Sequence, residues 1–147
     1  MTGLANRRAW ENDLPRELAR ADRDGRPLCV AMLDLDGFKV FNDQQGHQAG
    51  DRLLKECAAG WATRLRATDL LARFGGDEFA LLLPGCGLED AVALVGRLRG
   101  SMPPGQTLSA GVASWDRTER ADALVARADE ALYESKRAGR DRVVTSV

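Results

Sequence analysis

The acidic residues that could do chemistry lie in two short stretches of the sequence. The first stretch is an apolar run that ends in Asp34 and Asp36; in the second, residues 73–85, Asp77 and Glu78 follow two glycines. Neighbouring carboxylates repel each other unless a cation lies between them. Carboxylate oxygens with room for water and for a ligand suit Mg²⁺ bound to the phosphates of a nucleotide. The two stretches are therefore candidate halves of one metal site.

Two strands are needed to bring these acids together. The apolar run 28–36 is typical of a buried central strand. If this strand lies beside the segment that carries Asp77, then Asp34 and Asp77 meet at one edge of the sheet. Residues two apart on a strand face the same side, but Asp36 can already lie in the following loop, so its position stays open.

The second stretch reads as a β-hairpin. Apolar runs near 69–74 and 78–83 flank Gly75 and Gly76. A two-residue hairpin turn of the common type needs positive φ at both positions, which glycine supplies. We therefore predict a tight Gly75–Gly76 turn with Asp77 directly after it.

Other kinds of site fit the acidic stretches less well. The segment from Asp34 resembles a calcium-binding loop, but Phe38 stands at a ligand position and Gln45 at the place of the bidentate glutamate, which excludes it. No glycine-rich stretch ends in the lysine and hydroxyl of a P-loop. Taken alone, Asp34 and Asp36 could equally be solvated acids at a strand end.

The remaining segments alternate between the two kinds of periodicity. We predict helices over 5–23, 52–67, 88–98 and 121–138, strands over 107–113 and 142–147, and at most one helical turn within the polar stretch 37–51. Strands and helices alternate around a central hairpin, which favours an α+β fold: a mixed, partly antiparallel sheet flanked by helices, of the ferredoxin-like kind.

Length and composition exclude several classes of protein. The 147 residues fit one domain, and the net charge of −1 gives no general attraction to nucleic-acid polymers or acidic membranes. The three cysteines form no C-x-x-C pair, so neither a zinc site nor a disulfide framework is expected. There is no signal peptide and no membrane segment, so we predict a cytoplasmic protein.

Four motifs together resemble one family. "DLDGFKVFND", "GHQAGD", "RFGGDEF" and "SKRAGRDRV" occur in the order and at the spacing of the bacterial GGDEF-domain diguanylate cyclases, and the resemblance covers nearly the whole chain. It implies a fold related to the nucleotidyl-cyclase and polymerase palm. It also implies a second-messenger enzyme that condenses two GTP molecules into cyclic di-GMP and two pyrophosphates with Mg²⁺ or Mn²⁺.

The resemblance assigns roles to the acids. Asp34 and Asp77 match the metal-binding carboxylates, and Leu35 matches the residue whose backbone carbonyl also binds the metal. Asp77 additionally matches the proposed acceptor of the 3′-hydroxyl proton. Glu78 matches a signature acid that active members need.

The resemblance also implies a substrate site. Asn42 and Asp51 match the pair that recognises guanine; a carboxylate accepts both N1–H and N2–H₂, which adenine lacks as a pair, so GTP is favoured over ATP. Asp51 could instead cap a helix that starts at Arg52. Phe38 and Lys39 match the loop that contacts the phosphates, and Lys136 and Arg140 match a pair that binds phosphate in the family. His47 matches a position near the substrate, and we expect it to order its loop by a hydrogen bond. Without the motif, Lys136 and Arg140 would be ordinary cations at a helix C-terminus.

A second site is implied before the hairpin. Arg66 and Asp69 match the R-x-x-D product-binding site of the family, and Arg97 matches a further arginine of that inhibitory site. Arginine stacks on guanine and pairs with phosphate, as a cyclic di-GMP site requires. The simpler alternative is an arginine at a helix end followed by an aspartate in a turn.

The resemblance has consequences for assembly. One active site binds one GTP, so ring closure implies a homodimer about a two-fold axis. Residues 1–147 read as one catalytic domain, which we expect to be excised from a longer regulated protein, because no sensor domain is present. The connection 99–111 is shorter than usual, and Asp141 stands where asparagine is usual. A module that binds GTP or cyclic di-GMP without turnover remains the alternative, although the signature acids persist.

Overall fold

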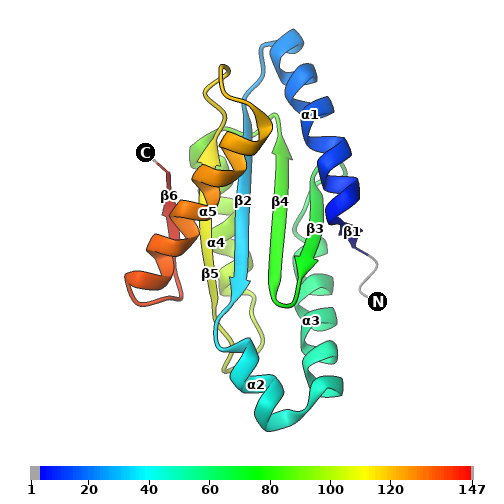
Figure 1. Ribbon diagram of the computed structural model, residues 1–147, viewed down its shortest axis with the longest axis vertical. Helices are drawn as coiled ribbons and strands as arrows, with labels where there is room; N and C mark the ends of the chain where they lie inside the picture. Colours follow the sequence, from blue (N-terminus) through cyan, green and yellow to red (C-terminus); the bar gives the residue numbers. More distant parts are fainter. Residues whose placement is uncertain (1–3, 147) are drawn as a thin grey trace.

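The computed structural model describes residues 4–146, which form one six-stranded mixed sheet with helices on both faces (Figure 1). The strands are β1 (Ala5–Asn6), β2 (Leu28–Leu35), β3 (Leu70–Gly75), β4 (Glu78–Pro84), β5 (Leu108–Ser114) and β6 (Val143–Thr145). The helices are α1 (Arg7–Asp24), α2 (Phe38–Gln45), α3 (His47–Ala62), α4 (Leu88–Gly100) and α5 (Ala121–Arg137). The predicted α+β class is confirmed.

The order of the strands is β1-β3-β4-β2-β5-β6. The strand β2 lies in the middle, antiparallel to both β4 and β5, while β1 and β6 add parallel edges to β3 and β5. Every residue of β2 is buried, which explains the apolar run from Leu28 to Leu33 and makes the buried Asp34 the exception within the strand. The predicted placement of this strand beside the hairpin is therefore confirmed.

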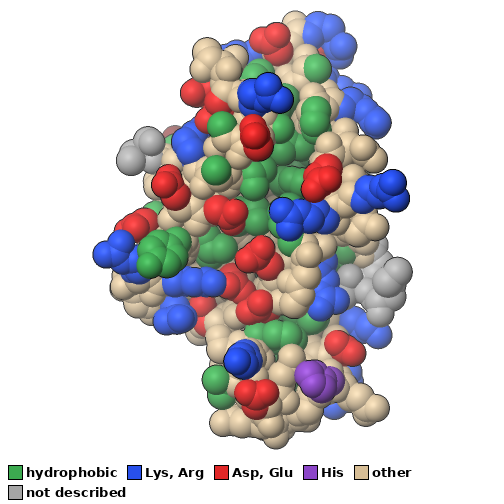
Figure 2. Space-filling model, viewed as in Figure 1, with side chains coloured by type: hydrophobic (Ala, Val, Ile, Leu, Met, Phe, Trp, Pro, Cys, Tyr) green, Lys and Arg blue, Asp and Glu red, His purple; other side chains and the backbone are tan. Residues whose placement is uncertain are grey.

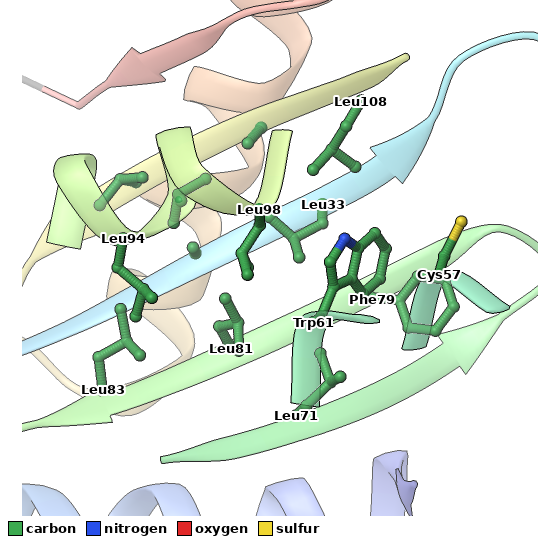
Figure 3. Packing of buried hydrophobic residues seen from close by; sticks show 14 of the residues in the cluster. Leu33, Cys57, Trp61, Leu71, Phe79, Leu81, Leu83, Leu94, Leu98 and Leu108 are labelled. Carbon is green, nitrogen blue, oxygen red and sulfur yellow. The ribbon is translucent and has the colours of Figure 1, made fainter. Parts of the chain in front are cut away.

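Alternate residues of the strands feed two separate hydrophobic layers. Cys29, Ala31, Leu33 and Leu35 of β2 pack with α3 and α4, whereas Leu28, Val30 and Met32 pack with α1 and α5. The α3 side is anchored by Trp61, whose ring meets Phe79 edge to face with centroids 5.1 Å apart (Figure 3). By the same alternation, position 34 of β2 belongs to the α5 side.

The other face of the sheet is covered by α1 and α5. The backbone of α5 approaches β5 closely at Gly111, where an added Cβ would lie 2.2 Å from the carbonyl oxygen of Ala128. Between α1 and α5 a groove of about 420 Å³ remains, with Trp10 and Phe74 among its lining residues. Figure 2 shows hydrophobic side chains along this part of the face, with acidic side chains gathered over the lower ends of β2 and β4.

Two helices differ from the prediction. The polar stretch 37–51 was expected to hold one helical turn, yet it contains all of α2 and the start of α3, and α3 ends at Ala62 rather than at 67. Phe38 is buried in the core and Gly46 has a φ of 90°, so the chain reverses there into a helical hairpin. Polar composition hid these helices because most of α2 faces outward.

The hairpin turn also differs from the prediction. Gly75 pairs with Glu78, so the turn is made by Gly76 and Asp77 rather than by the two glycines. The register shifts between Arg73 and Gly75, and this bulge moves the turn along by one residue. Both glycines have positive φ, 148° and 51°, so their conformational freedom is used although the turn is displaced.

The ends of the chain were predicted in part. The edge strand predicted at 142–147 is present as the shorter β6, and residue 147 lies outside the described residues. The strand β1 was not foreseen, because its residues were included in the helix 5–23. Within residues 4–146, the connection between α4 and β5 contains no strand. In the same described part of the chain, no helix is long and apolar enough to cross a membrane.

Candidate active site

The centre of the candidate site is Asp34, near the end of β2. It pairs in register with Glu78 of β4 on one side and with Ser109 of β5 on the other. The residue is only 6% exposed, and its Oδ2 forms an ion pair with Nζ of Lys136 from α5. Because side chains alternate between the two faces of β2, the carboxylate of Asp34 lies on the face covered by α5, near the C-terminal end of that helix.

The turn of the hairpin brings Asp77 beside Asp34. The backbone N–H of Leu35 donates to the carbonyl oxygen of Asp77 at 3.3 Å, which ties the turn to the end of β2. The guanidinium of Arg73 donates twice to the carbonyl oxygen of Gly76, at 3.1 and 2.9 Å. Sequence reasoning missed this role of Arg73, because nothing in the sequence indicates that its guanidinium folds back onto the turn.

Burial makes the charge on Asp34 unfavourable. Loss of solvent and the neighbouring Asp77 carboxyl raise the pKa of Asp34 to about 7, and the ammonium of Lys136 only partly offsets this. Its Oδ1 is buried without a hydrogen-bond partner. A buried carboxylate oxygen with no donor, beside a second carboxyl, is the arrangement that a divalent cation would relieve.

The chain supplies only part of a cation's coordination shell. Within residues 4–146, no three His, Cys, Asp or Glu side chains are grouped to hold a metal ion. Asp34 and Asp77, with the backbone carbonyl of Leu35, are oxygen donors of the kind that Mg²⁺ and Mn²⁺ bind. Mg²⁺ usually keeps water and takes substrate phosphates as further ligands, so this short donor set fits it.

Asp36 does not join Asp34. The strand β2 ends at Leu35, and the carboxylate of Asp36 accepts hydrogen bonds from Thr107 Oγ1 at 2.7 Å and from Ser109 Oγ at 2.6 Å. The position that the sequence left open is therefore settled: Asp36 lies in the loop, where hydroxyls at the start of β5 and just before it hold its carboxylate.

The predicted guanine pair lies on the helical hairpin of α2 and α3. Oδ1 of Asn42 is buried without a partner and lies over Gly50, where an added Cβ would be only 1.7 Å away. Asp51 is exposed one residue further along α3. The alternative of Asp51 as a helix cap is wrong, because α3 begins four residues earlier at His47.

The remaining residues of this hairpin have different environments. Phe38, the first residue of α2, is buried in the core, whereas Lys39 and His47 are exposed. No hydrogen bond or ion pair within the described residues engages the ring of His47, so the expected bond that would order its loop is absent. Gly50 was also missed from the sequence, and its bare α-carbon is what admits Asn42.

Lys136 and Arg140 lie on either side of the end of α5. The helix ends at Arg137, and Gly139 and Arg140 return N–H bonds to the carbonyls of Lys136 and Ser135 at 3.3 and 3.0 Å. This is a Schellman ending, as Gly139 indicated. Arg140 then has a φ of 64°, and its exposed guanidinium engages no carboxylate within residues 4–146.

A second cluster lies at the opposite end of the sheet. The guanidinium of Arg66 pairs with Oδ1 of Asp69 at 2.7 Å and donates to the carbonyl oxygen of Pro84 at 2.7 Å, while its backbone N–H donates to Oδ2 of Asp69 at 2.8 Å. Arg66 follows the end of α3, in a turn. Arg66, Asp69 and Arg97 line one hollow of about 280 Å³, so the structure brings the three predicted residues together.

Comparisons with known proteins agree on one family. Residues 1–142 match the family model described as "Diguanylate cyclase, GGDEF domain". The chain is 46% identical over 153 residues to the diguanylate cyclase DgcP of Pseudomonas aeruginosa, an alignment that covers 97% of the chain and 23% of DgcP. The chain spans about a quarter to a third of the length of the curated relatives that it matches first.

Solved structures give the same result. The GGDEF domain of PA1120 (YfiN or TpbB) from Pseudomonas aeruginosa superposes with a TM-score of 0.95 at 34% identity, covering 100% of this chain and 99% of that one. The GGDEF domain of DgcB from Caulobacter crescentus, in complex with c-di-GMP, gives a TM-score of 0.92 at 34% identity, covering 99% and 92%.

Proposed function

This chain belongs to the GGDEF-domain diguanylate cyclase family, and we propose that it condenses two molecules of GTP into cyclic di-GMP and two pyrophosphates. The single observation that carries the proposal is the state of Asp34. Its carboxylate is buried, carries a raised pKa and leaves Oδ1 without a donor beside Asp77. A purely structural aspartate would have both oxygens satisfied, as Asp36 has. Asp34 is paired only through Oδ2, with Lys136, and its free Oδ1 suits a cation.

In this proposal Asp34, Asp77 and the carbonyl of Leu35 hold Mg²⁺ or Mn²⁺. When bound, the cation would offset charge on the triphosphate and lower the repulsion between the two carboxylates. Asp77 would also accept the proton of the attacking 3′-hydroxyl, and Glu78, which pairs with Asp34 in register, is the second signature acid of the catalytic centre. The metal site needs no other carboxylate, because the remaining ligands would be phosphate and water.

The rest of the chain would hold the nucleotide. Lys39, with backbone N–H groups near Phe38, together with Lys136 and Arg140, would neutralise the phosphates. The carboxylate of Asp51 would accept from N1–H and N2–H₂ of guanine, the amide of Asn42 would contact the same base, and His47 would lie nearby. The unpartnered Oδ1 of Asn42 supports this role, because a buried acceptor without a donor is satisfied when a base N–H arrives.

The reaction would need two copies of the chain. Each 3′-hydroxyl must attack the α-phosphorus of the other GTP, so two sites would face each other across a two-fold axis. Positioning of the two nucleotides would then supply most of the rate enhancement. The chain would act as one catalytic domain of a longer regulated protein, and its cytoplasmic location stays a prediction.

Product inhibition would operate at the hollow around Arg66. Arg66 and Arg97 can stack on guanine or pair with phosphate, and Asp69 can accept from a guanine edge. The GGDEF domain of DgcB was solved in complex with c-di-GMP, which supports the presence of a product-binding site in the family. We propose cyclic di-GMP as the ligand of this hollow.

The experiment is an incubation of the purified chain, at high concentration, with GTP and Mg²⁺, followed by chromatography for cyclic di-GMP. Asp77→Ala should form no product, and Asp122→Ala, an exposed aspartate at the start of α5, should match the wild type. A wild-type chain that forms no product even when a fused coiled coil forces it to dimerise would contradict the proposal. That outcome would favour the alternative of a module that binds nucleotide without turnover.

A further inference from the structure

The turn that follows α5 has an unusual backbone. Arg140 and Asp141 have φ values of 64° and 47°, so two consecutive residues other than glycine adopt the left-handed conformation. Side chains with a Cβ disfavour this region, and a run of two residues there is held only when surrounding contacts impose it. The contacts that impose it therefore decide where the side chain of Arg140 points.

One of these contacts comes from Asp36. Its Oδ2 accepts the backbone N–H of Asp141 at 3.1 Å, in addition to the hydroxyl of Thr107. Its Oδ1 is held by the hydroxyl of Ser109, which is fully buried. The carboxylate of Asp36 is thus fixed by two hydroxyls, with one acceptor directed at the left-handed turn.

Other contacts restrain the remainder of the turn. Oγ of Ser135 donates to the carbonyl oxygen of Arg142 at 2.9 Å, and the side chain of Arg142 donates to the carbonyl oxygen of Arg140 at 2.9 Å. Arg99 of α4 donates to Oδ1 of Asp141 at 2.8 Å. Among the described residues, only Asp36 joins this turn to the segment that carries Asp34.

We propose that Asp36 is a positioning residue for Arg140. By holding the N–H of Asp141, it fixes the left-handed pair and places the guanidinium of Arg140 at a set distance from the end of β2. Asp34 lies two residues before Asp36. One short segment would therefore carry the carboxylate for the metal and also position the arginine that binds phosphate. This inference rests on the proposed function, in which Arg140 binds the triphosphate.

The test is equilibrium binding of a non-hydrolysable GTP analogue with Mg²⁺, in wild type and in a double-mutant cycle of Asp36→Ala and Arg140→Ala. Asp36→Ala removes both acceptor oxygens, so the bonds from the N–H of Asp141 and from the hydroxyls of Thr107 and Ser109 are all lost. Each single variant should weaken binding about tenfold, as expected for loss of a charge-assisted contact. The double variant should be no weaker than Arg140→Ala alone, because Asp36 acts through Arg140.

A matched control is available in Asp116→Ala. Asp116 also accepts three hydrogen bonds within a loop, from the N–H and hydroxyl of Thr118 and the N–H of Glu119, but at the far end of β5. This variant should bind the analogue like the wild type. It separates loss of a loop carboxylate in general from loss of Asp36.

The outcomes are distinct. Unchanged binding in Asp36→Ala, or losses in the two single variants that simply multiply in the double variant, would overturn the positioning role. A wild-type chain that neither binds the analogue nor forms product would instead overturn the proposed function.

Discussion

The two ends of the central sheet hold carboxylates in opposite states. At one end Asp34 is buried, repelled by Asp77 and left with an unpartnered oxygen. At the other end the side chain of Asp69 is also buried, but both of its oxygens accept bonds from Arg66. The first arrangement becomes more favourable when a cation arrives, whereas the second is already satisfied by the chain itself.

This difference bears on what each end can bind. A cation at Asp34 and Asp77 would remove an existing electrostatic penalty, so binding gains from relief of the repulsion between the two carboxyls. A ligand at Arg66 must share the guanidinium with Asp69 and with the carbonyl of Pro84. We therefore expect the end with Asp34 to be the catalytic site and the end with Arg66 to bind a regulatory ligand reversibly.

The largest effect should come from Asp34→Asn. The substitution removes an oxygen of the proposed metal site and the ion pair with Lys136, so cyclic di-GMP formation should fall about a thousandfold or more, as when electrostatic stabilisation of a transition state is lost. Product is measured by chromatography at saturating GTP and Mg²⁺. Turnover within about tenfold of wild type would mean that Asp34 does not hold the metal.

Arg66→Ala should give the next largest effect. The product concentration that halves the rate should rise about tenfold or more, since a bidentate arginine contact is lost, while the uninhibited rate stays close to wild type. Initial rates at increasing cyclic di-GMP provide the measurement. Arg16→Ala, at an exposed arginine of α1, is the control. Inhibition that persists unchanged in Arg66→Ala would place the product elsewhere.

Stability should change in opposite directions at the two ends. Without metal at pH 8, Asp34→Asn should raise the free energy of unfolding by about 1–2 kcal/mol, because a buried repulsion disappears. Asp69→Asn should lower it by about 1–3 kcal/mol, because the partners of a buried carboxylate lose their acceptor. Urea denaturation in a chelator measures both. Changes of the same sign would remove the contrast between the two ends.

The carboxyl of Asp34 should also make the stability of the protein depend on pH. The folded pKa of Asp34 is raised from 3.8 to about 7, so ionisation of Asp34 opposes folding. The folded state then holds a proton that the unfolded chain has lost, and metal-free wild type should lose stability relative to Asp34→Asn as pH rises from about 4 to about 7. Above that range the difference should stay constant. A difference in denaturation midpoint that is flat across the range from about pH 4 to about pH 8 would contradict the raised pKa.

The sequence predicted the architecture around the site because its signals are local. The apolar run before Asp34 and the glycines before Asp77 specify a central strand and a hairpin, and the family resemblance implied the same fold. The helix α2 and the start of α3 were missed because their residues are mostly polar and exposed, and only Phe38 and Phe41 of α2 pack on the core.

The finer contacts of the site depend on residues that meet only in the folded chain. Nothing near Asp36 in the sequence points to Thr107, Ser109 or Asp141. The displaced turn at Gly76 likewise depends on a bulge that composition does not encode. Gly50 reads as a helix-weakening residue until Asn42 is seen lying over it.

The most direct test of the contrast between the two ends is Mn²⁺ binding, followed by electron paramagnetic resonance, in the presence of a non-hydrolysable GTP analogue. Wild type, Asp34→Asn and Asp69→Asn are compared at the same protein concentration. We expect Asp34→Asn to weaken Mn²⁺ binding about tenfold or more, through loss of a charged ligand, and Asp69→Asn to match the wild type. Equal Mn²⁺ affinity in wild type and Asp34→Asn would contradict the assignment of the buried carboxylate to the metal.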